Sequence, residues 1–262
     1  PAAGGPTALG AGKWNARNVL ARGAIARRVV AGIAKVAAKA AAALSATQKG
    51  AAVQAMRRVL ASNDVNKSEA VAFVKENAHK VVELVRSVLD SKDDSEGLDP
   101  ATDGNATLDC LRRARIPGNR TQNKAVAVAV LRLARRVARA SALGEVTELK
   151  ADGIEMRGVS RTGADVANVT IETKRAKCKF PTTFALPGSN ESTVVQLSST
   201  EYDENLLGTT GAPAGSTLGS AVADFHVQVD DEDAEIKNQD PPLQLELAMN
   251  AYFHDLYKIL GI

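Results

Sequence analysis

The sequence predicts an α+β protein, with a bundle of helices in the first half and antiparallel strands in the second. Before Leu143, apolar residues recur every three to five positions on an Ala-rich background, which is the spacing of helices with one buried face. After it, apolar and polar residues alternate with a period of two, most clearly over 193–247. That alternation is typical of strands with one face on a core.

Five helices are expected in the first half. The first is rich in Ala, the best helix former; a basic amphipathic helix of this kind can also lie on an anionic membrane surface, although Ala supplies little apolar area for it. Gly144 follows the fifth helix where a C-cap glycine would stand, and the polar, acidic stretch 91–104 is expected to be a loop. The expected helices cover residues 14–44, 47–60, 68–90, 107–115 and 121–143.

Seven strands are expected in the second half, separated by stretches rich in Gly, Pro and Asp. They cover residues 146–150, 154–159, 169–174, 194–199, 218–229, 234–237 and 243–248. The patterns together divide the chain into a flexible arm over 1–12, a helical subdomain over 13–144, a strand subdomain over 145–249 and a short C-terminal helix over 250–262.

Charge is distributed unevenly between the two halves. Residues 1–145 carry 24 Lys and Arg against 12 Asp and Glu, whereas residues 146–262 carry 9 against 18. The split predicts two subdomains that attract one another, and it leaves nucleic acid or an acidic surface open as a partner of the first half. No run of 18 apolar residues occurs, so we expect no membrane-spanning segment within this chain.

Five of the 13 asparagines stand in N-x-S/T sequons without proline, more than this Ser and Thr content gives by chance. They are Asn66, Asn105, Asn119, Asn168 and Asn190. The excess favours a secreted or cell-surface glycoprotein. In an oxidising compartment the two cysteines, Cys110 and Cys178, are expected to form a disulfide between the helical and strand halves, although two buried free thiols would give the same sequence.

No motif for catalysis or cofactor binding is found in the sequence, so we expect neither an enzyme nor a bound cofactor. His79, His226 and His254 are far apart and have no partners at metal-ligand spacing, so we expect core or surface histidines. The acidic run 230–233 lacks the glycine-centred spacing of a calcium loop and is expected to be a solvated hairpin turn.

Two groups of arginines give the basic half the electrostatic footprint of a nucleic-acid-binding protein. They are Arg112, Arg113 and Arg115, and Arg135, Arg136 and Arg139. Aromatic residues make up only 3% of the chain and are nearly absent between Lys13 and Gly144, so base stacking has little to work with. We therefore expect no nucleic-acid partner.

Several short phrases follow the helices in a characteristic order. They are ALGE at 142–145, IEMR at 154–157, FALP at 184–187, VVQL at 194–197, NLLG at 205–208, LGSAV at 218–222 and PPLQLEL at 241–247. In this order the sequence resembles the GAIN domain of polycystin-type proteins, sperm receptor-for-egg-jelly relatives and adhesion-type G-protein-coupled receptors. The resemblance spans 45–249, and its specific part begins at Gly144.

The resemblance implies a helical subdomain followed by an antiparallel twisted β-sandwich, on the outside of a membrane protein and before its first transmembrane segment. It also implies partners among the other subunits of a membrane or surface complex, a polycystin-type channel among them. The family's self-cleavage motif has paired Cys and Trp residues and a cleavage tripeptide, but this chain has no Trp after Trp14 and no such tripeptide after Leu247. No catalytic residue is therefore carried over, and self-cleavage is not expected.

Three functions remain open at this point. The first is a non-enzymatic extracellular GAIN-like module of a polycystin-like membrane protein, in adhesion or mechanosensory coupling at the plasma or ciliary membrane. The second is a structural subunit of an extracellular or ciliary surface filament, with the Ala-rich helix and the apolar tail as contact surfaces. The third is an intracellular, basic helical protein that binds nucleic acid. N-linked glycans would separate the third from the other two.

Overall fold

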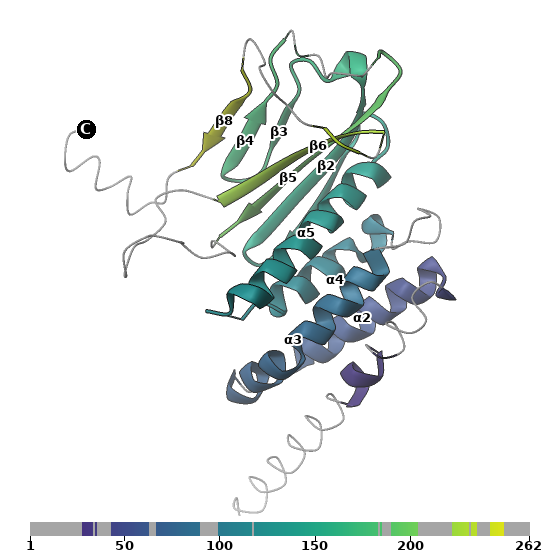
Figure 1. Cartoon of the computed structure of the whole chain (residues 1–262), viewed down its shortest axis with the longest axis vertical. Helices are drawn as coiled ribbons and strands as arrows, with labels where there is room; N and C mark the ends of the chain where they lie inside the picture. Colours follow the sequence, from purple (N-terminus) through teal and green to yellow (C-terminus); the bar gives the residue numbers. More distant parts are fainter. Residues whose placement is uncertain are drawn as a thin grey trace, which may run out of the picture.

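A computed structural model shows helices followed by two antiparallel sheets, which confirms the α+β fold class (Figure 1). The structure describes residues 28–33, 35, 43–62, 67–89, 99–116, 118–182, 184, 190–203, 222–230, 232–234 and 242–248. The expected arm over 1–12 and the expected helix over 250–262 lie outside the described residues. Of the expected first helix, residues 28–33 and 35 are helical, and most of the rest also lies outside them.

Four helices are described in full. They are α2 (Ala46–Ser62), α3 (Lys67–Leu89), α4 (Pro100–Arg113) and α5 (Arg120–Ala140). Each of the last two begins at a side-chain cap: Asp99 Oδ1 accepts the N–H of Ala101 at 2.9 Å, and Asn119 Oδ1 accepts the N–H of Gln122 at 3.0 Å. Such caps satisfy N–H groups that have no partner within the helix.

The structure corrects two boundaries of the helical half. Helix α4 begins at Pro100 within the expected loop 91–104, because Asp99 caps it and Pro100 suits the first helical position. Helix α5 ends at Ala140 with an extended Ser141, so Gly144 does not cap it. Gly144 instead has a φ of 86° in the turn before the first strand, and its N–H donates to Ser160 O at 2.8 Å.

In the described part of the chain, eight strands form two sheets, and every pair of neighbours is antiparallel. The strands are β1 (Val146–Ala151), β2 (Ile154–Thr162), β3 (Thr170–Glu172), β4 (Ala176–Lys179), β5 (Val194–Tyr202), β6 (Val222–Val229), β7 (Glu232–Asp233) and β8 (Gln244–Leu247). The orders are β1-β2-β5-β6-β7 in the five-stranded sheet and β3-β4-β8 in the three-stranded sheet. A short 3₁₀ helix, η3 (Gly163–Asp165), follows β2.

Strands β2 and β5 each run three residues beyond their predicted ends, and two further strand predictions differ more from the structure. The expected strand 169–174 is shorter, and β4 follows it unpredicted, because its inward residues are the small Ala176 and Cys178 between lysines. The expected strand 234–237 is replaced by the two-residue β7, and residues 235–237 lie outside the described residues. Within the acidic run, Asp230 lies in a turn after β6, whereas Glu232 and Asp233 form β7, and residue 231 lies outside the described residues.

The two faces of the five-stranded sheet carry separate apolar clusters. The helix-side cluster joins α2 to α5 with four sheet residues, Leu149, Ile154, Met156 and Tyr202. The sandwich cluster joins Val159, Val195, Leu197 and Val227 with residues of and next to the three-stranded sheet. Because neighbouring residues of a strand point to opposite faces, β2 contributes Met156 to one cluster and Val159 to the other. The molecule therefore has three layers: helices, the large sheet and the small sheet (Figure 1).

Candidate functional site

The helices approach the large sheet most closely at Gly158 of β2. A Cβ atom on this residue would lie 2.5 Å from the backbone nitrogen of Ala138 in α5, which no side chain tolerates. Two hydroxyls close the same contact: Ser160 Oγ donates to Ala138 O at 2.7 Å, and Ser141 Oγ lies 3.1 Å from Gly158 O. A glycine inside a strand marks such an approach of a second backbone.

Helix α4 contacts the edge strand β1 in a similar way. A Cβ atom on Gly104 would lie 2.7 Å from Leu149 Cδ1, so the helix rests directly on that side chain. One residue further on, Asn105 Oδ1 accepts the backbone N–H of Lys150 at 2.8 Å. Helix α4 therefore packs on the inner face of β1 and also holds a backbone group of that strand.

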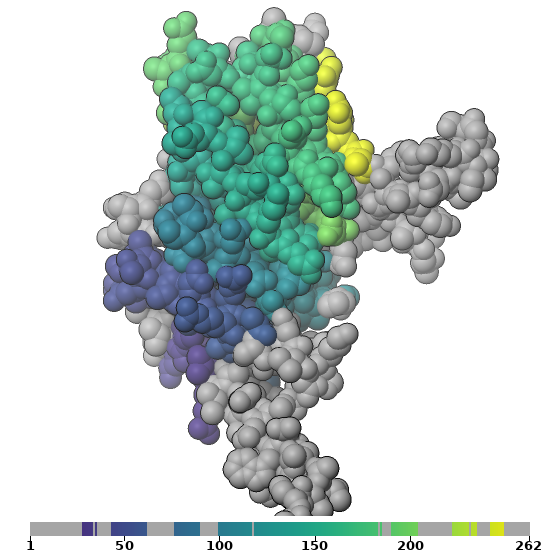
Figure 2. Space-filling model, turned by 180° about the vertical axis from the view of Figure 1, so that it is seen from behind, coloured from purple at the N-terminus to yellow at the C-terminus, as the bar shows by residue number. Residues whose placement is uncertain are grey.

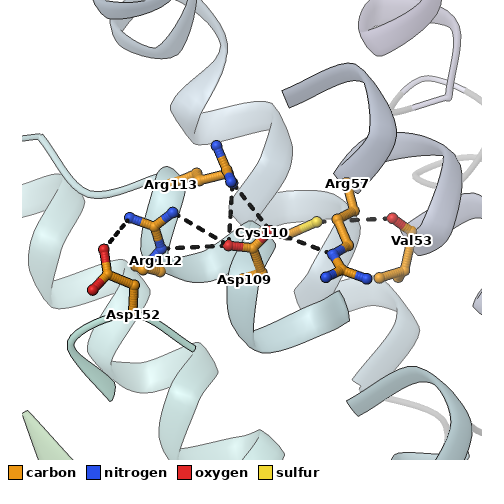
Figure 3. Close-up of polar contacts among 7 residues, drawn as sticks. All are labelled: Val53, Arg57, Asp109, Cys110, Arg112, Arg113 and Asp152. Atoms are coloured by element: carbon orange, nitrogen blue, oxygen red, sulfur yellow. Dashed lines mark hydrogen bonds and ion pairs between the residues drawn. The ribbon is translucent and has the colours of Figure 1, made fainter. Parts of the chain in front are cut away.

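Asp109 on α4 is the centre of a charged cluster that joins three parts of the fold (Figure 3). Its carboxylate lies 3.0 Å from Arg113 Nε, 3.3 Å from Arg112 Nε and 3.5 Å from Arg57 Nε of α2. Arg112 also reaches Asp152 in the turn between β1 and β2, at 3.4 Å. These contacts connect α2, α4 and the first hairpin, and Asp109 itself is mostly buried.

The two sheets are joined by a second charged contact. Arg175, between β3 and β4, donates from its backbone N–H and from Nε to the carboxylate of Glu201 on β5, both at 2.6 Å, and also pairs with Asp203. The side chain of Glu201 is only 5% exposed. Burial raises the pKa of Glu201, and hydrogen bonds from Arg175 and Thr173 lower it. The hydrogen bonds have the larger combined effect, so the pKa lies below its usual value.

A third polar contact lies where α5 meets the outer strands of the large sheet. Arg135 of α5 pairs with Asp233 of β7. His226 on β6 is half-buried nearby, and its pKa is lowered, chiefly by burial and also by the charge of Arg135. The carboxylates of Asp224 and Asp233 raise the pKa, but by less. Asp233 therefore serves an interlayer ion pair.

The arginines that suggested a phosphate-binding surface are largely engaged within the fold. Arg112 and Arg113 pair with Asp109, Arg135 pairs with Asp233, and Arg136 is buried. Arg112 and Arg113 meet a carboxylate of their own helix, and Arg135 meets one of a neighbouring strand.

The histidines are not brought together. His79 is exposed on α3, His226 lies on β6, and His254 is outside the described residues. Among the residues that the structure describes, no three His, Cys, Asp or Glu side chains gather as a metal site requires. No helix in the described part of the chain is long and apolar enough to cross a membrane.

The expected disulfide between Cys110 and Cys178 is wrong. Both cysteines are free and buried, Cys110 in the helix-side cluster and Cys178 in the sandwich cluster, so the large sheet separates them. Burial raises the pKa of Cys110 to about 12 and that of Cys178 to about 11. The Cys110 sulfur points to the carbonyl of Val53 at 3.8 Å (Figure 3).

All four sequon asparagines in the described part of the chain are exposed. Asn105 lies on α4, Asn119 caps α5, Asn168 has a φ of 61° in the turn before β3, and Asn190 accepts hydrogen bonds from Ser192 and Thr193 before β5. Asn66 is outside the described residues. Glycosylation at these five positions stays a prediction.

Sequence reasoning missed the contacts that join the layers. Gly158 carried a usable signal, since glycine interrupts an otherwise regular strand pattern. Gly104 was assigned to an expected loop, and Asn105 directly follows that loop, so neither was expected to contact a strand. No local sequence pattern indicates that Arg175 pairs with Glu201 or that Asp109 pairs with Arg57. The predicted division at 144/145 falls between α5 and β1, but the helix-side cluster contains residues from both sides of it.

Comparisons with known proteins leave the family open. No family model matches the sequence, and no curated protein matches it. Among solved structures, the full extracellular region of zebrafish Gpr126/Adgrg6 is similar at 13% identity and a TM-score of 0.35. The match covers 70% of this chain but only 25% of that chain, so this chain spans about a quarter of that structure. This level of similarity does not establish a shared fold or function.

Proposed function

We propose that the chain is a non-enzymatic, extracellular, GAIN-like module of a polycystin-like cell-surface protein, which couples adhesion or mechanical force to the membrane part of that protein. The observation that carries the extracellular location is the exposure of all four described sequon asparagines, on separate parts of the fold. A glycan at any of these positions would project from a surface and disturb no packed layer.

The coupling role is supported by the contacts between layers. Helices and large sheet share one apolar cluster, the Asp109 cluster connects two helices to the first hairpin, and Arg175 connects the two sheets. A force applied to the helices therefore reaches the small sheet through packed contacts and ion pairs. A hinge between independent subdomains would absorb that force.

The location is tested by the intact mass of the protein purified from its natural source, before and after enzymatic removal of N-glycans. We expect the mass to fall on treatment, with glycopeptides that map to the sequons of this chain. A mass that does not change on treatment, together with unmodified sequon peptides, would overturn the proposal and return the basic helical half to an intracellular role.

The coupling role is tested by pulling the chain from its two ends in a single-molecule experiment. We expect helices and large sheet to unfold in one cooperative step, because Leu149, Ile154, Met156 and Tyr202 belong to the helices' own apolar cluster. Separate helical and strand steps at well-spaced forces would contradict this role and support two independent subdomains.

A second function, a structural subunit of an extracellular or ciliary surface filament, is favoured by β8. This short edge strand lies on the flank of the molecule (Figure 2), where Leu245 is 61% and Leu247 is 45% exposed. Exposed apolar edge strands are common assembly contacts. Mass mapping of the complete natural polypeptide separates the two functions, since only the first requires covalent continuation into membrane helices.

A further inference from the structure

Among the described strands, β1 stands at an edge of the large sheet. This strand pairs with β2 over all six of its residues, and no described strand pairs with its other side. An unpaired edge offers N–H and C=O groups to a strand of another molecule. Two apolar residues at this edge, Leu143 and Val146, are 59% and 57% exposed. Each copy of the chain therefore carries the same exposed edge.

Asn105 stands beside this edge. Its Oδ1 accepts the N–H of Lys150 at 2.8 Å, so it occupies the place that a carbonyl of an added strand would take. The hydrogen bond fixes the side-chain amide of Asn105 next to the strand. Further along β1, no described strand pairs with Val146 or Glu148 on this side.

Asn105 is also the first residue of the sequon Asn105-Ala106-Thr107. An N-glycan is bonded to Nδ2, which shares its carbon atom with the Oδ1 that binds Lys150. The first sugar would therefore be attached to the same amide that contacts the edge. This anchoring distinguishes Asn105 from Asn119 and Asn190, whose side chains accept hydrogen bonds from residues two or three positions away in the sequence.

We propose that an N-glycan on Asn105 covers the free edge of β1 and prevents pairing of this edge with a second copy of the chain. The proposal rests on the extracellular location proposed above. Charged residues, bulges and covering helices are common protections of edge strands. Here α4 covers the Lys150 end, and the glycan extends that cover toward Val146 and Leu143.

The test compares two matched variants of the full chain, secreted from a glycosylating cell. Asn105→Asp removes the glycan but keeps an oxygen acceptor for Lys150. Asn119→Asp removes a different glycan and keeps the N-cap of α5, since aspartate caps as well as asparagine. Sedimentation velocity over a concentration series reports self-association. We expect wild type and Asn119→Asp to stay monomeric, and Asn105→Asp to self-associate at least about tenfold more tightly.

Adding Val146→Lys to Asn105→Asp places a charge on the exposed edge and should restore the monomer. Equal sedimentation of wild type and Asn105→Asp, with Asn105 fully glycosylated in wild type, overturns the proposal. A natural protein with glycans at other sequons and a bare Asn105 also overturns it, while the proposed location stands. A natural protein without any N-glycan overturns both.

Discussion

The two faces of the large sheet are closed in different ways. On the helix side, α5 rests on Gly158 with backbone against backbone, and neutral hydroxyl hydrogen bonds from Ser160 complete the contact. On the sandwich side, the apolar cluster is smaller and a buried ion pair between Arg175 and Glu201 joins the sheets. The contact of α5 with Gly158 therefore depends on shape and the contact of Arg175 with Glu201 on charge, so steric substitutions and pH should act on these two contacts separately.

The largest effect is expected from Gly158→Ala, which tests the dependence on shape. The new methyl group would overlap the backbone of α5, and relief requires a shift of the helix, so we expect a loss of about 3 kcal/mol in the free energy of unfolding. Denaturant titration measures it. Gly32→Ala is the control, because nothing lies within 4 Å of its Cβ position. The control should be neutral or stabilise the helix by up to about 1 kcal/mol. Equal stability of both variants would refute the close contact.

A smaller loss, about 2 kcal/mol, is expected from Arg175→Ala, because the buried carboxylate of Glu201 then loses its charged donor. Lys177→Ala in the same small sheet is the control: its ion pair with Glu246 is 3.9 Å long and exposed, and it should contribute less than about 1 kcal/mol. Thermal unfolding of both at pH 7 gives the comparison. Similar losses would mean that the sheets are joined by the apolar cluster alone.

The charged face should also respond to acid. The pKa of Glu201 is lowered below its usual 4.5 in the folded chain, so its stabilisation is complete above pH 4.5 and is lost as pH falls through the folded value. Glu201→Gln has no ionisable carboxyl group at this position and so lacks this pH-dependent stabilisation. The difference in unfolding free energy between wild type and this variant should therefore be largest at neutral pH and shrink from pH 4.5 downward. Parallel stability curves from pH 7 to pH 3 would contradict the assignment.

The smallest effect, an absence of reaction, is expected at the two cysteines, one behind each face. With pKa values of about 12 and 11, no more than about one thiol in a thousand is ionised at pH 8, and both are buried. The native chain should resist alkylation, and the denatured chain should take up two labels without prior reduction. A denatured chain that needs reductant before labelling would restore the disulfide and contradict the packing described here.

The sequence by itself determined the order of helices and strands, because the spacing of apolar residues reports which face of each element is buried. The periodicity of α5 and the alternation of β5 and β6 located these elements to within a few residues. The sequence also contains a signal for the start of α4, because Asp99 is a good N-cap residue and Pro100 suits the first helical position. The acidic composition around them favoured a loop instead.

The tertiary structure alone decided which distant residues meet. It placed Cys110 and Cys178 on opposite faces of one sheet, Arg175 against Glu201, and Asn105 against Lys150. Local sequence patterns indicate which residues are buried, but they do not indicate which distant residues pack against them. A cysteine pair, an ion pair or a glycan beside an edge depends on how layers are stacked, and that stacking follows from the packing of the whole chain.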